Sequence, residues 1–141
     1  MRQTLTLPNF PSPKCARALS PNGRAHWATK RAHTKAVKEV VHVRALILEL
    51  GQMQGVVEIQ PTFIYPVARK RDDDNLATGV LKAVRDGLVE AGYLKADDME
   101  HVIQKRPIVE VRKGTRALIL TFTELNDDQA PASAHQSTPE D

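Results

Sequence analysis

The chain has 141 residues, of which 41% are apolar and 26% are charged, a composition typical of one globular domain rather than a disordered or membrane protein. No run approaches the roughly 18 consecutive apolar residues of a membrane span, and the first residues lack the apolar stretch of a signal peptide. The single cysteine, Cys15, excludes an internal disulfide, so we expect a cytoplasmic protein without membrane contact.

The net charge of +3 is unevenly distributed along the chain. Residues 126–141 carry four acidic side chains and no Lys or Arg, whereas the other 125 residues carry 20 basic and 13 acidic side chains. Residues 1–50 contain nine basic and only two acidic side chains. Such an excess of positive charge favours a polyanionic partner, most commonly nucleic acid. A basic face that is only solvated is the alternative.

The first 50 residues predict a strand, a loop and a long helix. Alternating apolar residues between Gln3 and Leu7 predict a short strand, which is followed by a proline-rich loop and a turn at residues 20–23. Residues 27–50 contain no Gly or Pro and predict an amphipathic helix. Its expected apolar stripe consists of Ala32, Ala36, Val37, Val40, Val43 and Ile47.

The other face of this helix is basic. Side chains at steps of four, three and four residues align along one side, where they could follow a phosphate backbone. These side chains are Arg31, Lys35, Lys38 and His42. For any one of them, a solvated face is an equally good interpretation.

Residues 56–65 predict a strand, in which Pro61 indicates a sheet edge or a bulge. After it comes the charge reversal Arg69-Lys70-Arg71-Asp72-Asp73-Asp74-Asn75. Adjacent carboxylates repel one another, so three together usually hold a cation or a proton, and the run is a candidate metal site. If the extended conformation persists, Asp72 and Asp74 project to one face and Asp73 projects away.

A second helix is predicted to begin with Asp74 or Asn75 as its N-cap and to end at Gly92. Its apolar stripe is Leu76, Val80, Ala83, Val84, Gly87, Leu88 and Ala91. On an ideal helix Asn75, Lys82 and Asp86 share one side, the side on which the acidic run begins. An ordinary surface ion pair between Lys82 and Asp86 is the alternative interpretation.

The last part of the predicted domain begins with an acidic turn at residues 96–100, which contains Asp97 and Asp98. Residues 101–111 resemble a strand that Pro107 confines to an edge or a bulge, Lys113-Gly114 predicts a hairpin, and residues 116–124 alternate as a strand. We therefore expect an α/β (α+β) domain over residues 1–125, a small mixed sheet with two main helices packed against it. Residues 126–141 are predicted to be a disordered acidic tail.

The charged residues follow one another in a recognisable order. Asp72-x-Asp74-Asn75, Lys82-x-x-x-Asp86, Leu88, Ala91-Gly92-Tyr93 and Asp97-Asp98 together resemble the RusA family of Holliday junction resolvases of phages and prophages. The resemblance is strongest over residues 69–102. It implies a homodimeric, magnesium-dependent endonuclease that cuts four-way DNA junctions in recombination and repair, with manganese as a possible substitute for magnesium.

The resemblance also assigns roles to residues of this chain. It implies that Asp72, Asp74 and Asp98 are catalytic carboxylates that bind the metal, with Asp97 as a further ligand and Lys82 as a supporting cation. Asn75 and Asp86 are expected to support them. The predicted DNA contacts are Arg31, Lys35, Lys38, Arg69, Lys70 and Arg71.

One departure from the family concerns Lys82. Two residues separate the Asn from the Lys in well-known members, whereas six separate Asn75 from Lys82. Four extra helical residues return nearly to the same face but move the side chain about 6 Å along the axis. The late acidic pair is also shifted by one residue, so Asp97 and Asp98 could exchange roles.

Independently of the family resemblance, the chemistry of these groups is consistent with nuclease activity. Phosphodiester cleavage needs an activated water and a counter-charge, both of which magnesium bound by carboxylates supplies. The acidic run lacks the spacing of an EF-hand, and no glycine-rich phosphate loop indicates a nucleotide cofactor. A non-catalytic junction- or duplex-binding protein, whose acids are structural, is the alternative function.

Overall fold

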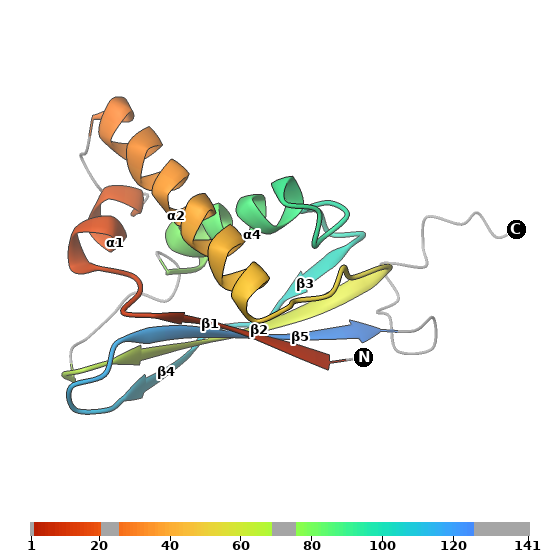
Figure 1. The fold of residues 1–141 in the computed structure, drawn as a ribbon. Coiled ribbons are helices and arrows are strands. Elements are labelled where there is room, and N and C mark those ends of the chain that lie inside the picture. Colours follow the sequence, from red (N-terminus) through yellow and green to blue (C-terminus); the bar gives the residue numbers. More distant parts are fainter. Residues whose placement is uncertain (1, 21–25, 69–75, 126–141) are drawn as a thin grey trace, which may run out of the picture.

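In the part of the chain that the computed structural model describes, residues 2–20, 26–68 and 76–125, helices cover one face of a five-stranded sheet (Figure 1). This arrangement confirms the predicted α+β class with a small mixed sheet. The elements in chain order are β1 (Arg2–Pro8), α1 (Pro13–Leu19), α2 (Trp27–Ile47), β2 (Val56–Tyr65), the π-helical turn η1 (Leu76–Val80), α4 (Leu81–Glu90), β3 (Val102–Gln104), β4 (Ile108–Val111) and β5 (Ala117–Leu125).

The strand β2 is the centre of the sheet. The strand order is β1-β5-β2-β3, and β4 also pairs with β2, beyond the end of β3. The β1–β5 and β5–β2 pairs are antiparallel, whereas β3 and β4 run parallel to β2. A parallel neighbour requires a crossover connection, and α4 lies in the connection from β2 to β3. The turn that follows α4 therefore has to return to the sheet beside the beginning of β2.

Alternating residues of three strands face the helices and form the core. On β2 the buried alternating residues are Val57, Ile59, Phe63 and Tyr65, and on β5 they are Leu118, Leu120 and Phe122. Full burial of one such side chain contributes about 1.5–3 kcal/mol. The helices add Val37, Val41, Ala45, Leu81, Val84 and Leu88 to the same cluster.

The prediction of a proline-rich loop is wrong for residues 13–19, which form α1. The Ser12 Oγ accepts a hydrogen bond of 3.0 Å from the Cys15 amide and caps this helix. Pro13 is tolerated at the first helical position because the amide that it lacks has no helical partner there. Burial raises the pKa of the Cys15 thiol. The predicted turn at residues 20–23 lies largely outside the described residues.

The helix α2 exists as predicted, but the prediction of its buried face is wrong. Its buried residues are Val37, Val41 and Ala45. Of the predicted stripe only Val37 is buried, whereas Ala32, Ala36, Val40, Val43 and Ile47 are exposed. The helix carries two apolar faces, and packing against α4 and β1 selects the one with the smaller side chains.

Two details of the sheet also differ from the predictions. Pro61 lies in the central strand and not at an edge. In β2 the amide of Val57 and the carbonyl of Ile59 form hydrogen bonds towards β3. Every second residue of a strand points its backbone groups to the same side, so the nitrogen of Pro61 faces the gap between β3 and β4. Pro61 therefore removes no hydrogen bond between strands. Lys113-Gly114 forms a turn but not a hairpin, because β2 lies between β4 and β5. Pro107 does separate two short strands, β3 and β4.

The second main helix begins less regularly than predicted. The π-helical turn η1 precedes α4, so the rotation of an ideal helix does not apply between Asn75 and Lys82. Within α4 the predicted stripe is confirmed for Ala83, Val84, Gly87 and Leu88, and Leu81 joins it. Gly92 ends the helix with a positive φ of 88°. The proposed caps Asp74 and Asn75 lie outside the described residues.

Candidate functional site

A cavity of about 570 Å³ lies beside α4 and contains residues from the middle and the end of the predicted motif, Lys82 and Asp97-Asp98. We call it the Asp97 cavity. It is lined by Thr78, Lys82, Arg85, Asp97, Asp98, Met99, Val102 and Gln104. The cavity therefore brings Lys82 together with both acids of the late pair, as the order of motifs predicts.

The Asp97 carboxylate is held by two cations of α4. Its Oδ1 accepts a hydrogen bond of 2.7 Å from Arg85 Nε, and its Oδ2 lies 3.5 Å from Lys82 Nζ. The side chains of Arg85 and Asp97 are only 16% and 15% exposed, whereas that of Lys82 is 58% exposed. Lys82 Nζ also lies 3.3 Å from Asp86 Oδ1. Lys82 thus contacts two carboxylates, and its ion pair with Asp86 is not an isolated surface pair.

Asp98 has a different environment from Asp97. Its Oδ1 accepts hydrogen bonds from the amides of Glu100 and His101, at 3.0 and 3.1 Å, and lies 2.7 Å from His101 Nδ1. The hydrogen bond with His101 lowers the pKa of the Asp98 carboxyl below its ordinary value. Asp98 therefore caps its own turn with one oxygen, while Asp97 faces the cations of α4.

The acidic turn is fixed at both ends by backbone hydrogen bonds. After α4, the Tyr93 amide donates to the Leu88 carbonyl, and the Tyr93 carbonyl accepts from the Met53 amide. At the other end the Val57 amide donates a hydrogen bond to the His101 carbonyl oxygen, and the pairing of β2 with β3 starts there. The parallel crossover from β2 through α4 to β3 thereby returns Asp97 to the side of α4 that carries Lys82 and Arg85.

Arg85 and Gln104 are members of this site that the sequence did not single out. Arg85 also donates from Nη1 to Gln104 Oε1 on β3. The position of Arg85, three residues after Lys82 on one helix, is a signal that could have found it. For Gln104 the sequence contains no such signal, because its proximity depends on the pairing of β2 with β3.

Several predicted site residues lie outside the described residues: Arg69, Lys70, Arg71, Asp72, Asp74 and Asn75. Within residues 2–20, 26–68 and 76–125, no group of three or more His, Cys, Asp or Glu side chains is arranged to hold a metal ion. The carboxylates at the Asp97 cavity are hard oxygen donors of the kind that magnesium prefers. The further ligands that the resemblance implies, Asp72 and Asp74, lie outside the described part of the chain.

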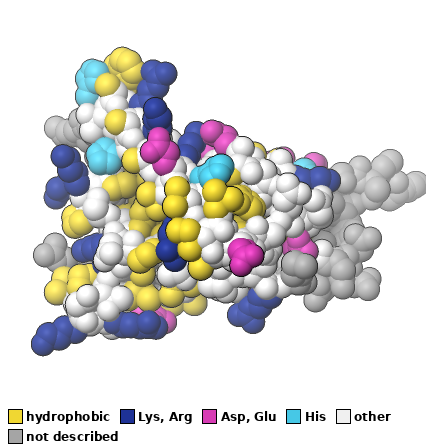
Figure 2. Space-filling model, viewed as in Figure 1, with side chains coloured by type: hydrophobic (Ala, Val, Ile, Leu, Met, Phe, Trp, Pro, Cys, Tyr) yellow, Lys and Arg dark blue, Asp and Glu magenta, His cyan; other side chains and the backbone are white. Residues whose placement is uncertain are grey.

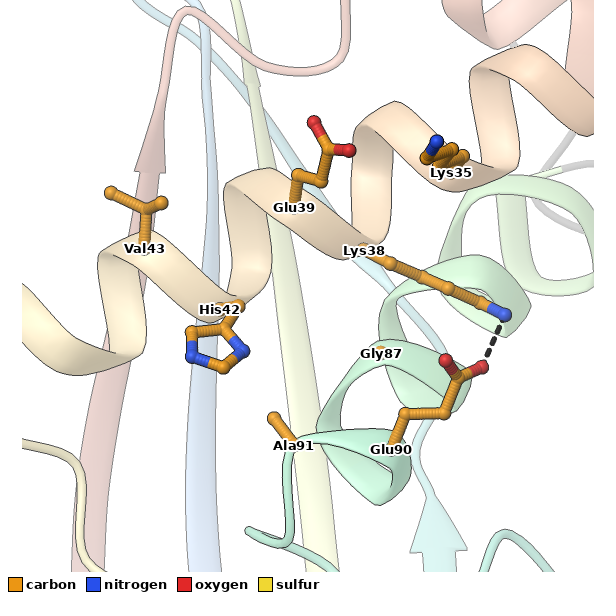
Figure 3. A pocket seen from close by; sticks show the side chains of 8 residues that line it. All are labelled: Lys35, Lys38, Glu39, His42, Val43, Gly87, Glu90 and Ala91. Carbon is orange, nitrogen blue, oxygen red and sulfur yellow. Dashed lines mark hydrogen bonds and ion pairs between the residues drawn. The ribbon is translucent and has the colours of Figure 1, made fainter.

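The basic residues of α2 lie on the other side of α4. Arg31 stacks on the exposed Trp27 ring, with 5.9 Å between the guanidinium carbon and the ring centroid. Lys35 is exposed, whereas Lys38 is partly buried and forms an ion pair with Glu90 of α4. Figure 3 shows these lysines beside a groove of about 510 Å³ between the two helices. We call it the α2–α4 groove.

A stripe of exposed apolar side chains runs along α2. Val40, Val43 and Ile47 are 38%, 53% and 59% exposed, and Ala36 extends the stripe by one turn. Figure 2 shows hydrophobic side chains gathered over this part of the molecule. We call Ala36, Val40, Val43 and Ile47 the α2 stripe. Scattered apolar side chains are ordinary on a protein surface, but a continuous stripe is typical of an interface.

A scan against models of protein families gives no match to this chain, and a search of curated proteins gives none either. The resemblance to the RusA family therefore stays a prediction from the motif residues. Over the described ranges, no helix has both the length and the apolar character that crossing a membrane requires.

Proposed function

We propose that the chain is a magnesium-dependent endonuclease of the RusA type that cuts four-way DNA junctions. The observation that carries the proposal is the meeting of Lys82, Asp86 and Asp97 at one side of α4. Asp97 is 15 residues from Lys82 in the sequence, and both belong to the motifs that resemble the RusA family.

Chain connectivity supports the missing half of the site. Asn75 is bonded to Leu76, the first residue of η1, and Thr78 of the same turn lines the Asp97 cavity. Asp74 precedes Thr78 by four residues, so covalent geometry keeps their α-carbons within about 15 Å. Asp72 and Asp74 are therefore the carboxylates that we propose to complete a ligand set with Asp97 or Asp98.

Each side chain then has a role that its environment permits. Magnesium, or manganese in its place, would supply an activated water and a counter-charge for the phosphate. Lys82, whose ammonium is more exposed than the other cation of Asp97, is suited to lie against the phosphate undergoing attack. Of the late pair, Asp97 has the position facing Lys82, and Asp98 has one oxygen engaged in its own turn. We therefore propose Asp97 as the principal ligand of the pair.

DNA binding is proposed for the basic residues of α2, Arg31 and Lys35 above all, together with Arg69, Lys70 and Arg71. Arg31 and Lys35 are exposed on one side of the helix. Exposed cations of this kind bind phosphates without reading sequence, and the affinity depends strongly on salt.

The homodimer that the resemblance implies has a suitable surface in the α2 stripe. If two copies of α2 pair antiparallel about a two-fold axis, Val40 meets the partner's Val43, and Ala36 meets the partner's Ile47. Apolar groups then meet along the whole stripe, as a self-complementary interface requires. The two helix dipoles also oppose each other in this arrangement.

A non-catalytic junction-binding protein is the second candidate, and one observation favours it. The Asp97 carboxylate already has two cationic partners, as a structural acid would. Cleavage of a synthetic four-way junction with magnesium, and with linear duplex as competitor, distinguishes the two functions.

Asp74→Asn is the decisive variant for the enzyme proposal. It removes one negative ligand but retains the size of the side chain and its ability to cap a helix. Cleavage should fall by about two orders of magnitude or more, corresponding to roughly 3 kcal/mol of transition-state stabilisation. The melting temperature and metal-free junction affinity should be retained. A variant that cuts at the parental rate would exclude Asp74 from the site.

The dimer is tested by Val43→Glu. A carboxylate in a self-complementary apolar interface is desolvated and faces its own copy, so the variant should be monomeric by sedimentation at concentrations where the parent is a dimer. Val111→Glu on β4 is the matched control, because Val111 is 52% exposed, like Val43 at 53%. Equal association states for the two variants would show that the α2 stripe is not the interface.

A further inference from the structure

We infer that Arg85 is a positioning residue, which holds the Asp97 carboxylate so that its second oxygen is presented beside Lys82 in the Asp97 cavity. The inference rests on the proposed function and extends it, because no motif of the resemblance includes Arg85.

The geometry divides the Asp97 carboxylate into two halves. Arg85 Nε binds Oδ1 at 2.7 Å, and Oδ2 is left on the side of Lys82, at the longer distance of 3.5 Å. Arg85 and Asp97 are both nearly buried, so water screens their ion pair less than it screens the Lys82 contact. The strong contact thus fixes the carboxylate, and the weak, exposed contact occupies the oxygen that a ligand would use.

The second contact of Arg85 fixes the guanidinium itself. Arg85 Nη1 donates to Gln104 Oε1, and Gln104 belongs to β3, which is paired with β2 through Ile59. The guanidinium is planar and presents its donors in a rigid fork, so two acceptors determine its orientation. Arg85 therefore connects Asp97 in the turn, α4 and the central sheet. Lys82, with one ammonium group on a flexible stem, cannot provide this orientation.

The role fits the needs of the proposed reaction. Groups that orient a catalytic carboxylate typically change activity by about 10- to 100-fold when removed, although they do not touch the substrate. Because Arg85 acts through Asp97, its loss should affect the chemical step more than substrate binding.

The first test measures the contact without any activity. In an ¹H–¹⁵N spectrum of metal-free protein, the Arg85 Nε–H should give a resolved, slowly exchanging signal, assigned by its loss in Arg85→Lys. Asp97→Asn should shift this signal strongly, whereas Arg112→Met should leave it unchanged, since Arg112 pairs with Glu110 away from the cavity. An Arg85 signal that Asp97→Asn does not move would overturn the inference.

The second test compares kcat and KM for junction cleavage. Arg85→Met should lower kcat by about 10- to 100-fold with little change in KM, and Arg85→Lys should recover part of the loss. Gln104→Met removes the anchor of the Arg85 guanidinium to β3 but leaves its bond to Asp97. Gln104→Met should lower kcat less than Arg85→Met does. If Arg85→Met fails to fold, the comparison is made with Arg85→Lys, and Gln104→Met should lower kcat less than that variant does.

The outcomes separate the two proposals. If the parent cuts junctions and Arg85→Met retains the parental kcat, Arg85 has no positioning role but the proposed function stands. If the Arg85 variants raise KM as much as they lower kcat, the effect is structural and the inference is wrong. A parent that does not cut junctions with magnesium overturns the proposed function and the catalytic role of Arg85 together, whereas the spectrum still reports whether the contact exists.

Discussion

The Asp97 cavity and the α2–α4 groove lie on two sides of the same helix and have similar volumes, about 570 and 510 Å³. Both contain acids and bases. In the Asp97 cavity, however, two cations meet one carboxylate, and the shorter ion pair is nearly buried. In the groove, Lys38 and Glu90 form a simpler pair, in which the Glu90 side chain is 63% exposed.

This difference indicates which of the two regions is suited to chemistry. An exposed ion pair is worth little and is screened by salt, whereas charges that converge in a partly buried place have strong effects on one another. Volume does not distinguish the regions, but convergence and burial of charge do. The following predictions test the distinction by matched changes on the two sides of α4.

The largest expected difference is between Asp97→Asn and Glu90→Gln. Each change neutralises an acid that pairs with a lysine. Asp97→Asn should lower junction cleavage by about 100-fold or more, because it removes a charge at the proposed metal, whereas Glu90→Gln should leave the rate within a factor of two or so. Single-turnover cleavage at saturating magnesium measures both. Equal losses would show that the two regions do not differ in function.

A smaller difference, in stability, is expected between alanine substitutions of Gly79 and Gly87. A Cβ at Gly79, next to Thr78 of the cavity, would lie 2.4 Å from the Leu19 carbonyl oxygen. Gly79→Ala should therefore force η1 away from α1 and lower the free energy of unfolding by about 1–3 kcal/mol. Urea denaturation, compared at equal m-values, measures the change.

Gly87→Ala in the groove is the control for that substitution. Its Cβ would lie 3.2 Å from the Lys38 Cα, so a shift of a few tenths of an ångström suffices. The better helix propensity of alanine, about 1 kcal/mol, should offset most of that cost. If Gly79→Ala is as stable as Gly87→Ala, the close packing of η1 on α1 is not present in solution.

The sequence predicts strands better than it predicts which face of a helix is buried. In β2 and β5 the large apolar residues fall mostly at alternate positions, and these positions are buried, although Ile64 of β2 is buried as well. In α2, Val37 and Val41 on one side and Val40 and Val43 on another are chemically alike. Which pair is buried depends on the position of α4, and no local pattern contains this information.

The same limit applies to the candidate site. Lys82, Asp86 and Asp97 belong to one set of motifs, but the way in which they meet depends on the crossover from β2 to its parallel neighbour β3, which the sequence did not predict. The separate environments of Asp97 and Asp98 could not be predicted, because adjacent residues differ there only through the hydrogen bonds of one turn. The contact of Arg85 with Gln104 depends on strand register, which a single sequence does not determine.

The smallest expected effect concerns the two lysines of the groove and their contribution to DNA binding. Lys35 is exposed, so a phosphate that it contacts releases a counterion, and Lys35→Ala should reduce the slope of log K against log salt by about 0.9. Lys38 is already neutralised by Glu90. A phosphate must displace that carboxylate, so Lys38→Ala should change the slope less.

The Glu90→Gln background makes the comparison of these lysines specific. There Lys38 has lost its carboxylate partner, so Lys38→Ala should now reduce the slope about as much as Lys35→Ala does in the parent. Junction binding without magnesium, measured at several salt concentrations, gives the slopes of the parent, the three single variants and the double variant. If Lys38→Ala already equals Lys35→Ala in the parent, the Lys38–Glu90 pair does not hold in solution, and the groove is a DNA contact in its own right. If neither substitution changes the slope, Lys35 and Lys38 do not bind phosphate.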